Sequence, residues 1–202
     1  MTVDHMDIAQ LIVDALKFIF PAYCANATPV LAGGGTRMDF GKNFFDGKRV
    51  FGNNKTFRGF FFGLAIGVLV GLMETVAFHF PVLFAFLIPL GALLGDLAGA
   101  FLKRRVGIEP GGLLPIVDQV DFVIGAIVFA IPLGSIVSWP LAVTVLLITP
   151  PIHLLTNFLA YKMKLKKPLG KKTTQLPTSM NFSSEFSCLL FSLLNRWVIF
   201  AR

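Results

Sequence analysis

Long apolar stretches alternate with short polar and basic segments along this chain. Five stretches stand out, at residues 8–32, 59–80, 82–102, 120–138 and 141–161. Each is close to the ~20 residues that a helix needs to cross a bilayer. The connections after Phe80 and Ser138 are very short, so the helices on either side are expected to form antiparallel hairpins. The pattern predicts an all-α integral membrane protein with five transmembrane helices.

Residues 1–172 hold all five stretches and their connections, and are predicted to form one membrane domain. The tail, residues 173–202, differs in composition, because a polar and irregular segment leads into an apolar run at 188–201. That run is interrupted by Asn195 and Arg196 and is too short to span a bilayer comfortably. No role is predicted for the tail, and its removal after Lys172 is expected to be tolerated.

Glycine recurs at every fourth position in two neighbouring stretches. The second stretch has Gly59, Gly63, Gly67 and Gly71, and the third has Gly91, Gly95 and Gly99. Small residues at this spacing form a smooth ridge on one helix face and let helix backbones approach closely. The two helices are therefore expected to pack ridge against ridge. Because Gly95 and Gly99 flank Asp96, they could also leave room for a phosphate or a nucleotide.

The composition supports a membrane protein and argues against a nucleic-acid partner. Hydrophobic residues make up 55% of the chain and charged residues 14%, whereas a soluble domain has nearer a quarter charged. Mean hydropathy is +0.75. The net charge is +7, but the basic residues cluster between apolar stretches. The two cysteines, Cys24 and Cys188, have no metal-ligand spacing and do not suggest a disulfide framework.

The placement of Lys and Arg predicts an orientation in the cell membrane. Segment 33–58 holds six of them, three follow the third stretch directly, and segment 162–172 holds six. The two short turns hold none. The positive-inside rule therefore places the N-terminus outside, and the basic loops and the tail after the fifth stretch in the cytoplasm.

Segment 95–121 carries the clearest candidate chemistry, because charged residues mark the ends of two apolar stretches there. They are Asp96, Lys103, Arg104, Arg105, Asp118 and Asp121. Asp96 and Lys103 share a helix face, as do Asp118 and Asp121. The glycines and prolines of 110–115 favour a loop that lets the two helix ends meet. Carboxylates beside cations can hold a divalent cation against a phosphorylated substrate. The alternative is a structural network of salt bridges.

A second candidate is the loop at residues 36–58, which combines glycines with Lys, Arg and Asn. Its candidate contacts are Asp46, Lys48, Arg49, Asn53, Asn54, Lys55, Thr56 and Arg58. Glycines permit close backbone approach and cations neutralise phosphate oxygens, so the loop suits a phosphate or nucleotide. The spacing GxxxxGK[ST] of a P-loop is absent. A membrane-surface anchor is the alternative. Asn26, in the first stretch, could contact the substrate or bond to a neighbouring helix.

At these residues the chain resembles a known family. GDLAGAFLKRR followed by PGGLLPIVDQVD looks like the signature of the CTP-dependent cytidylyltransferases that make CDP-activated lipids. The chain keeps Lys103–Arg104 and the Asp-x-x-Asp spacing of Asp118 and Asp121, but has Ala100 near the expected serine and Gln119 in place of arginine. PAYCANATPV and DFGKNFFDGKRVFGNNKTFRG resemble the archaeal branch, the CDP-archaeol synthases, and the likeness covers roughly residues 8–170.

The resemblance implies transfer of CMP from CTP to 2,3-bis-O-(geranylgeranyl)-sn-glycerol 1-phosphate, with Mg²⁺ required and pyrophosphate released. It implies that cytoplasmic loops form the active site. Asp96, Asp118 and Asp121 would hold Mg²⁺, and Lys103 and Arg104 would act with them in catalysis. Substrate-binding residues would be Arg105, Asn26, Asp46, Lys48, Arg49, Asn53, Asn54, Lys55, Thr56 and Arg58. One alternative is a CDP-diacylglycerol synthase. Another is a small anion transporter, although no internal repeat is evident.

Overall fold

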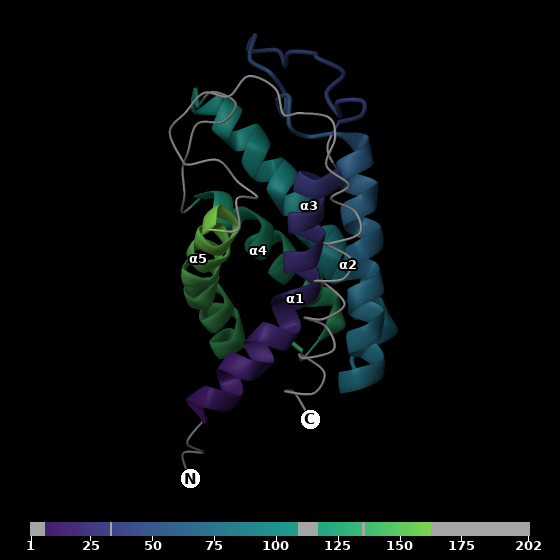
Figure 1. Ribbon diagram of the computed structural model, residues 1–202, viewed down its shortest axis with the longest axis vertical. Coiled ribbons are helices and arrows are strands. Elements are labelled where there is room, and N and C mark those ends of the chain that lie inside the picture. Colours follow the sequence, from purple (N-terminus) through teal and green to yellow (C-terminus); the bar gives the residue numbers. More distant parts are fainter. Residues whose placement is uncertain (1–6, 33, 109–116, 135, 163–202) are drawn as a thin grey trace. The chain divides into compact units, whose positions relative to one another are not determined.

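The computed structural model describes residues 7–32, 34–108, 117–134 and 136–162 (Figure 1). Apart from the loop at residues 34–56 and short connections, these residues are helical, and the described ranges contain no strand beyond two isolated bridges. The elements are α1 (Ile8–Ala32), α2 (Phe57–Phe78), α3 (Val82–Arg105), α4 (Val117–Ala130), a 3₁₀ turn (Ile131–Leu133) and α5 (Trp139–Lys162). The five predicted helices are confirmed. The described residues up to Pro150 form one compact unit, and the rest of α5, from Pro151, belongs to a second unit.

Helices α1, α2 and α3 are long and apolar enough to cross a membrane. The fourth predicted stretch differs from its prediction, because α4 has 14 residues and is about 21 Å long. The chain passes into the 3₁₀ turn at Ile131–Leu133, where Pro132 has no amide hydrogen to continue an α-helix. Gly134 then takes a positive φ of 71° and turns the chain toward α5.

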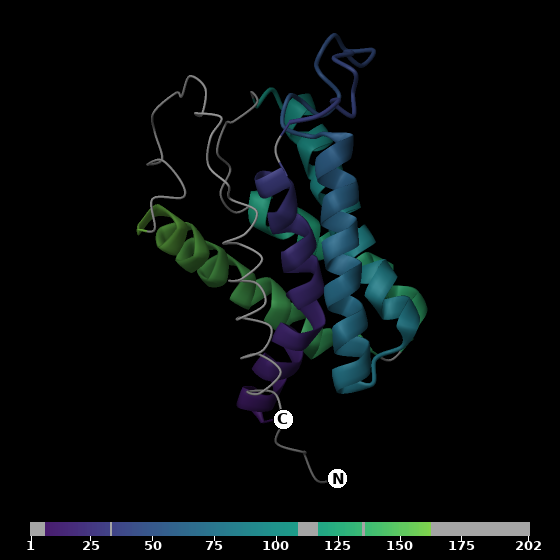
Figure 2. The same cartoon turned by 45° about the vertical axis from the view of Figure 1, so that its right-hand side comes forward.

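Helix α2 has a defined start and end, which fix the hairpin with α3. The Thr56 hydroxyl accepts a hydrogen bond from the Gly59 amide at 3.1 Å and caps the first turn. At the other end His79 adopts a left-handed conformation, with φ of 60°, and Pro81 precedes α3. Figures 1 and 2 show α2 and α3 running in opposite directions beside each other, as the short connection predicted.

The glycines of α2 do allow close packing, but against different partners from those predicted. A Cβ placed on Gly63 would lie 2.6 Å from the backbone oxygen of Ala25 in α1. A Cβ placed on Gly71 would lie 2.6 Å from the Cα of Ala85 in α3. The α2 ridge therefore packs against both α1 and α3, at positions of α3 that are not its glycines. The prediction of ridge against ridge is wrong.

The glycines of α3 instead face α4. A Cβ on Gly95 would lie 2.9 Å from the Cα of Gly125, and one on Gly99 would lie 2.6 Å from the Cβ of Asp121. The space predicted for a phosphate beside Asp96 is thus filled by α4 itself. The sequence pattern identified the close approach but not the helix that makes it, because Gly125 is a single glycine with no repeat around it.

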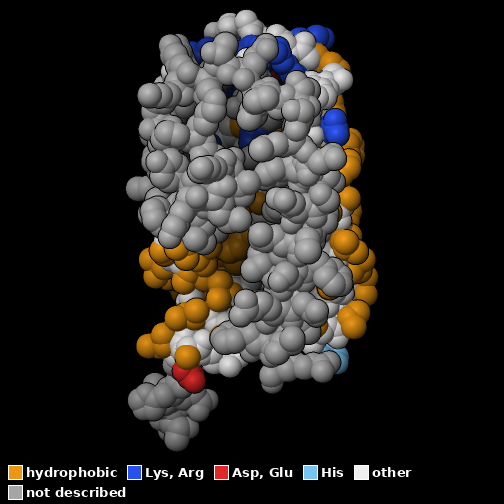
Figure 3. Space-filling model, viewed as in Figure 1, with side chains coloured by type: hydrophobic (Ala, Val, Ile, Leu, Met, Phe, Trp, Pro, Cys, Tyr) orange, Lys and Arg blue, Asp and Glu red, His pale blue; other side chains and the backbone are white. Residues whose placement is uncertain are grey.

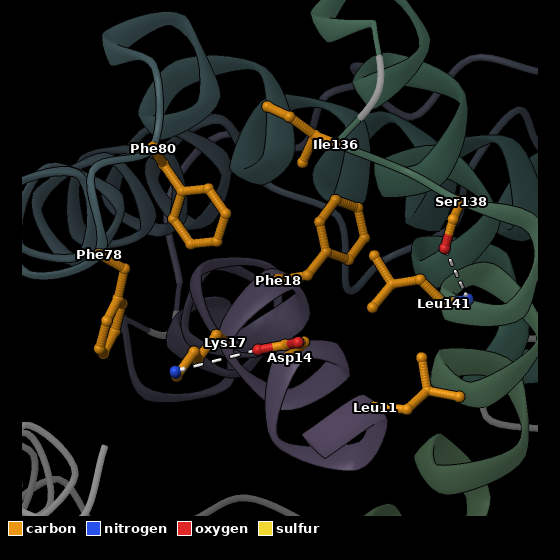
Figure 4. Close-up of a pocket in the computed structure, with 9 residues that line it drawn as sticks. All are labelled: Leu11, Asp14, Lys17, Phe18, Phe78, Phe80, Ile136, Ser138 and Leu141. Atoms are coloured by element: carbon orange, nitrogen blue, oxygen red, sulfur yellow. Dashed lines mark hydrogen bonds and ion pairs between the residues drawn. The ribbon is translucent and has the colours of Figure 1, made fainter. Parts of the chain in front are cut away.

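A cavity of about 480 Å³ lies at the end of the unit where α2 turns into α3 (Figure 4). Its walls are mostly apolar side chains such as Phe18 and Phe80. Its two charged residues are Asp14 and Lys17. The Lys17 ammonium lies 4.0 Å from a carboxylate oxygen of Asp14 and 4.7 Å from the centre of the Phe78 ring. None of the predicted catalytic residues lines this cavity.

Candidate active site at the loop between α1 and α2

The loop at residues 34–56 is folded around one buried carboxylate, that of Asp39, which is 5% exposed. Its oxygens accept hydrogen bonds from the amides of Gly41 at 2.9 Å, Gly52 at 3.0 Å and Phe51 at 3.4 Å. The Arg49 guanidinium adds bonds at 2.9 and 3.1 Å. Asp39 therefore ties the first part of the loop to the segment at 49–52.

These contacts explain a shift in acidity. Burial of the Asp39 carboxyl acts to raise its pKa, but the hydrogen bonds from Arg49 and the backbone amides outweigh it and lower the pKa from 3.8 to about 2. The carboxylate is therefore charged at all physiological pH values, and its negative charge is part of the loop's structure.

The C-terminal end of α3 holds the same segment from the other side, mainly through Arg105. Its guanidinium donates to the backbone oxygen of Arg49 at 2.6 Å and forms an ion pair with Asp46. It also lies 4.9 and 4.7 Å from the ring centres of Phe44 and Phe101. The Lys48 ammonium donates to the backbone oxygen of Arg105 at 2.8 Å. These groups bind the loop to α3.

Arg104 adds a further link between α3 and the loop. Its guanidinium donates to the backbone oxygen of Phe51 at 3.4 Å and to that of Ile108. Phe51 is the residue whose amide donates to Asp39. One short stretch of the loop is thus held by Asp39 within the loop and by two arginines from the helix end.

Two lysine–aspartate pairs lie where the loop, α3 and α4 meet. Lys55, from the loop, pairs with Asp96 in α3. Lys103, from the last turn of α3, pairs with Asp121 in α4 at 3.1 Å. The Asp96 and Asp121 carboxylates are near enough to interact electrostatically. Because Gly99 has no side chain, Asp121 can approach α3 closely. The site therefore contains alternating positive and negative charges at the edge of an apolar bundle.

The structure brings together Asp96, Lys103, Asp121 and Lys55 among the predicted site residues. Asp46, Lys48, Arg49, Arg104 and Arg105 lie in the adjoining contacts between loop and helix. Thr56 caps α2. The side chains of Asn53, Asn54 and Arg58 are exposed, and Asn26 is half-buried in α1. Asp118 lies in the first turn of α4, but its side chain is outside the described part, as is the predicted loop at 110–115.

The described residues do not by themselves form a metal site. Within them, no group of three or more His, Cys, Asp or Glu side chains could hold a metal ion. Asp96 and Asp121 supply two carboxylates, and carboxylate oxygens are the donors that Mg²⁺ prefers. The third predicted ligand, Asp118, is three residues from Asp121 on the same helix. The donor types in this region therefore fit a magnesium ion.

Asp39, which organises the loop of the candidate site, is not among the residues that the sequence predicts for it. A signal was present, since Asp39 is one of only two acidic residues in a basic, glycine-rich loop, the other being Asp46. Nothing in the spacing, however, indicates that Asp39 and Arg49, ten residues apart, would meet. The aromatic contacts of Phe44 and Phe101 with Arg105 were missed for the same reason, because they join segments far apart in the sequence.

An apolar helical bundle with paired carboxylates and cations at one end is the arrangement expected of a membrane-embedded enzyme that acts on phosphates. The family model described as CarS-like, CDP-archaeol synthase, matches residues 8–169. The chain belongs to the CDP-archaeol synthase family, whose members are nucleotidyltransferases of lipid biosynthesis.

Similar proteins come from several archaea. The CDP-archaeol synthase of Pyrococcus furiosus is 46% identical over 161 residues, which is 77% of this chain and 96% of the relative. That of Methanococcus aeolicus is 42% identical over 175 residues, covering 80% and 98%. A solved structure of an intramembrane enzyme for archaeal membrane lipid biosynthesis matches with a TM-score of 0.68 and 41% identity, covering 73% of this chain and 94% of that one.

Proposed function

We propose that this protein transfers CMP from CTP to the phosphate of 2,3-bis-O-(geranylgeranyl)-sn-glycerol 1-phosphate, giving CDP-2,3-bis-O-(geranylgeranyl)-sn-glycerol and pyrophosphate. The names of its relatives in the family support this reaction. The observation that carries the proposal is the pair of lysine–aspartate contacts, Lys55 with Asp96 and Lys103 with Asp121, at the meeting point of three segments.

The chemistry needs positioning and charge neutralisation more than proton transfer. A lipid phosphate oxygen attacks the α-phosphorus of CTP, the bond from that phosphorus to the β-phosphate bridge breaks, and pyrophosphate leaves. A phosphate nucleophile is already ionised at neutral pH, so no general base is required. Both reactants are anionic, and the cations that hold them together lower the barrier. Lys55 and Lys103 would contact phosphate oxygens in this step.

Magnesium would be held by Asp96 and Asp121, together with Asp118 from the same end of α4. When bound, it would supply charge stabilisation to the triphosphate oxygens. The loop contacts of Asp39 and Arg105 would keep Lys48 to Lys55 in place beside those carboxylates. The exposed Asn53 and Asn54 are then available to the nucleotide.

The reaction is tested with purified protein in detergent, with CTP and Mg²⁺. Geranylgeranyl ether phosphate and diacyl phosphatidic acid are supplied in parallel, and CDP-lipid and pyrophosphate are measured. We expect turnover of the ether lipid, and a large loss of it in Asp121→Asn but not in Asp14→Asn, which alters an acid lining the distant cavity. Preference for the diacyl lipid would favour a CDP-diacylglycerol synthase. Turnover of neither lipid by folded protein would refute the proposed reaction.

We further propose that the loop and the end of α3 lie in the cytoplasm and the N-terminus outside. The Lys and Arg residues of segments 33–58 and 103–105 support this orientation. It is tested by replacing Asn53 with cysteine and labelling vesicles of known sidedness with an impermeant thiol reagent. Labelling of right-side-out vesicles alone would reverse the assignment.

A further inference from the structure

Helix α2 presents an exposed apolar face along its whole length. The exposed large side chains are separated by steps of one, three or seven residues, which keeps them on one helix face: Phe61, Phe62, Leu69, Leu72, Met73 and Val76. The opposite face carries the glycines that pack against α1 and α3. Figure 3 shows hydrophobic side chains along the side that α2 forms. In a membrane-embedded protein such a face lies against lipid tails, and we call it the α2 lipid face.

Two arginines lie at the loop end of the α2 lipid face. Arg58 is exposed and precedes Phe61 and Phe62 by one helical turn. Arg37 is also exposed, and it forms a β-bridge with Thr56, two residues before Arg58. The backbone before Arg37 is also close, since a Cβ on Gly35 would lie 2.9 Å from the Cβ of Arg58. Neither guanidinium makes a hydrogen bond or ion pair with another described residue.

Phe40 extends the same surface beyond the start of the helix. Its ring is 5.5 Å from that of Phe57, and the residue is 66% exposed. Its backbone has a φ of 47°, in the left-handed region that bulky residues avoid. An exposed aromatic side chain in a strained conformation adds nothing to the core, and strain of this kind concentrates at functional positions. Phe40 is held there by its neighbour Asp39, whose carboxylate accepts from the Gly41 amide.

We propose that Arg37, Phe40 and Arg58 form a rim where the phosphate headgroup of the lipid substrate is received from the bilayer. The proposal rests on the proposed function and adds the side from which the lipid arrives. Two guanidinium groups suit a phosphate, because their donors match its oxygens and no carboxylate among the described residues occupies them. The tails would remain along the α2 lipid face, and Phe40 would lie at the level of the headgroups.

The rim is also close in sequence to the reacting groups. Lys55, which pairs with Asp96, precedes Arg58 by three residues, and Met38 donates a backbone hydrogen bond to Lys55 at 2.9 Å. A phosphate bound at the rim would therefore need to move only past the start of α2 to reach Lys55. The Arg49 and Arg105 guanidinium groups, by contrast, are already paired with Asp39 and Asp46.

Kinetics with two substrates test the rim. We expect Arg37→Gln and Arg58→Gln each to raise KM for the lipid phosphate about tenfold or more, because each removes charge-assisted hydrogen bonds. KM for CTP and kcat at saturating lipid should stay within about twofold. Lys42→Gln, which removes another exposed cation of the same loop, is the matched control and should leave the lipid KM unchanged. An equal rise in both KM values, or no rise in the lipid KM, would overturn the proposal.

A second measurement locates the rim without relying on activity. Trp139→Phe and Trp197→Phe remove the native tryptophans, and Phe40→Trp then reports its depth in vesicles containing lipids brominated near the headgroup. We expect quenching of Phe40→Trp by these lipids, as for Phe61→Trp on the α2 lipid face. Asn53→Trp, on the exposed part of the loop, should instead be quenched by aqueous iodide. If Phe40→Trp behaved like Asn53→Trp, the rim would not face the membrane, even if the enzyme made CDP-lipid normally.

Discussion

The loop between α1 and α2 should depend on the charge of a single residue, Asp39. Replacing Asp39 with Asn keeps one acceptor oxygen but turns an NH₂ group toward the Arg49 guanidinium and the backbone amides of Gly41, Phe51 and Gly52, which are all donors. The pKa of the carboxyl falls from 3.8 to about 2 in the folded loop, which corresponds to about 2 kcal/mol in favour of the charged form.

The expected effect follows from that energy. A loss of about 2 kcal/mol changes the closed-to-open equilibrium of the loop roughly 30-fold. We expect deuterium uptake over residues 40–52 to accelerate in Asp39→Asn at pH 7, and kcat/KM for CTP to fall by at most the same factor. The melting temperature of the helical bundle should change little, because its core contains none of the loop residues.

The stabilisation of the loop by Asp39 should be lost at low pH. The folded pKa of Asp39 lies below its unfolded value, so its stabilising contribution is complete above pH ~4 and is lost as the pH falls toward 2. Wild-type uptake, corrected for intrinsic exchange, should therefore rise over that window and reach the level of Asp39→Asn. Asp14→Asn removes a half-exposed carboxylate far from the loop and should alter neither measurement. Unchanged uptake in Asp39→Asn would refute the role assigned to this carboxylate.

Three further predictions concern the reaction site. Asp121→Asn should reduce turnover at least a hundredfold while the protein remains folded in detergent, and full activity would remove this residue from the site. Gly99→Ala places a methyl group 2.6 Å from the Cβ of Asp121, so it should destabilise the α3–α4 contact by about 1–3 kcal/mol and lower both activity and melting temperature. A normal melting temperature in Gly99→Ala would contradict the packing described. Chelation by EDTA should abolish turnover, and added Mg²⁺ should restore it; activity that persists in EDTA would exclude a magnesium requirement.

The sequence predicted the helices well because their apolar runs are long and have clear polar ends. The predicted start and end of the first stretch, 8–32, match α1, and Val82 begins α3 as expected. The fourth helix was predicted too long, since the residues after Ala130 are apolar and a hydropathy pattern does not distinguish an α-helix from the 3₁₀ turn at Pro132.

The sequence predicted which charged residues lie in the site but not how they pair. Helical periodicity places Asp96 and Lys103 on one face, but it does not say which charges meet across segments. Lys103 pairs with Asp121, and Asp96 pairs with Lys55, which is 41 residues earlier in the chain. These pairings depend on the close approach of α4 to Gly99 and on the folding of the loop against α3. Both are tertiary contacts, which the local sequence pattern does not predict.

The contacts between the end of α3 and the loop limit which segments can be exchanged between relatives. Arg104 and Arg105 hold the loop largely through its backbone oxygens, while Lys48 returns a bond to the backbone of Arg105. Hydrogen bonds to backbone oxygens do not depend on the identity of the side chains, so these bonds can form with loops of different sequence. The side-chain contacts of Arg105 with Asp46, Phe44 and Phe101 do depend on that identity. We therefore expect a chimaera that takes residues 34–56 from one relative to need residues 101–108 from the same donor.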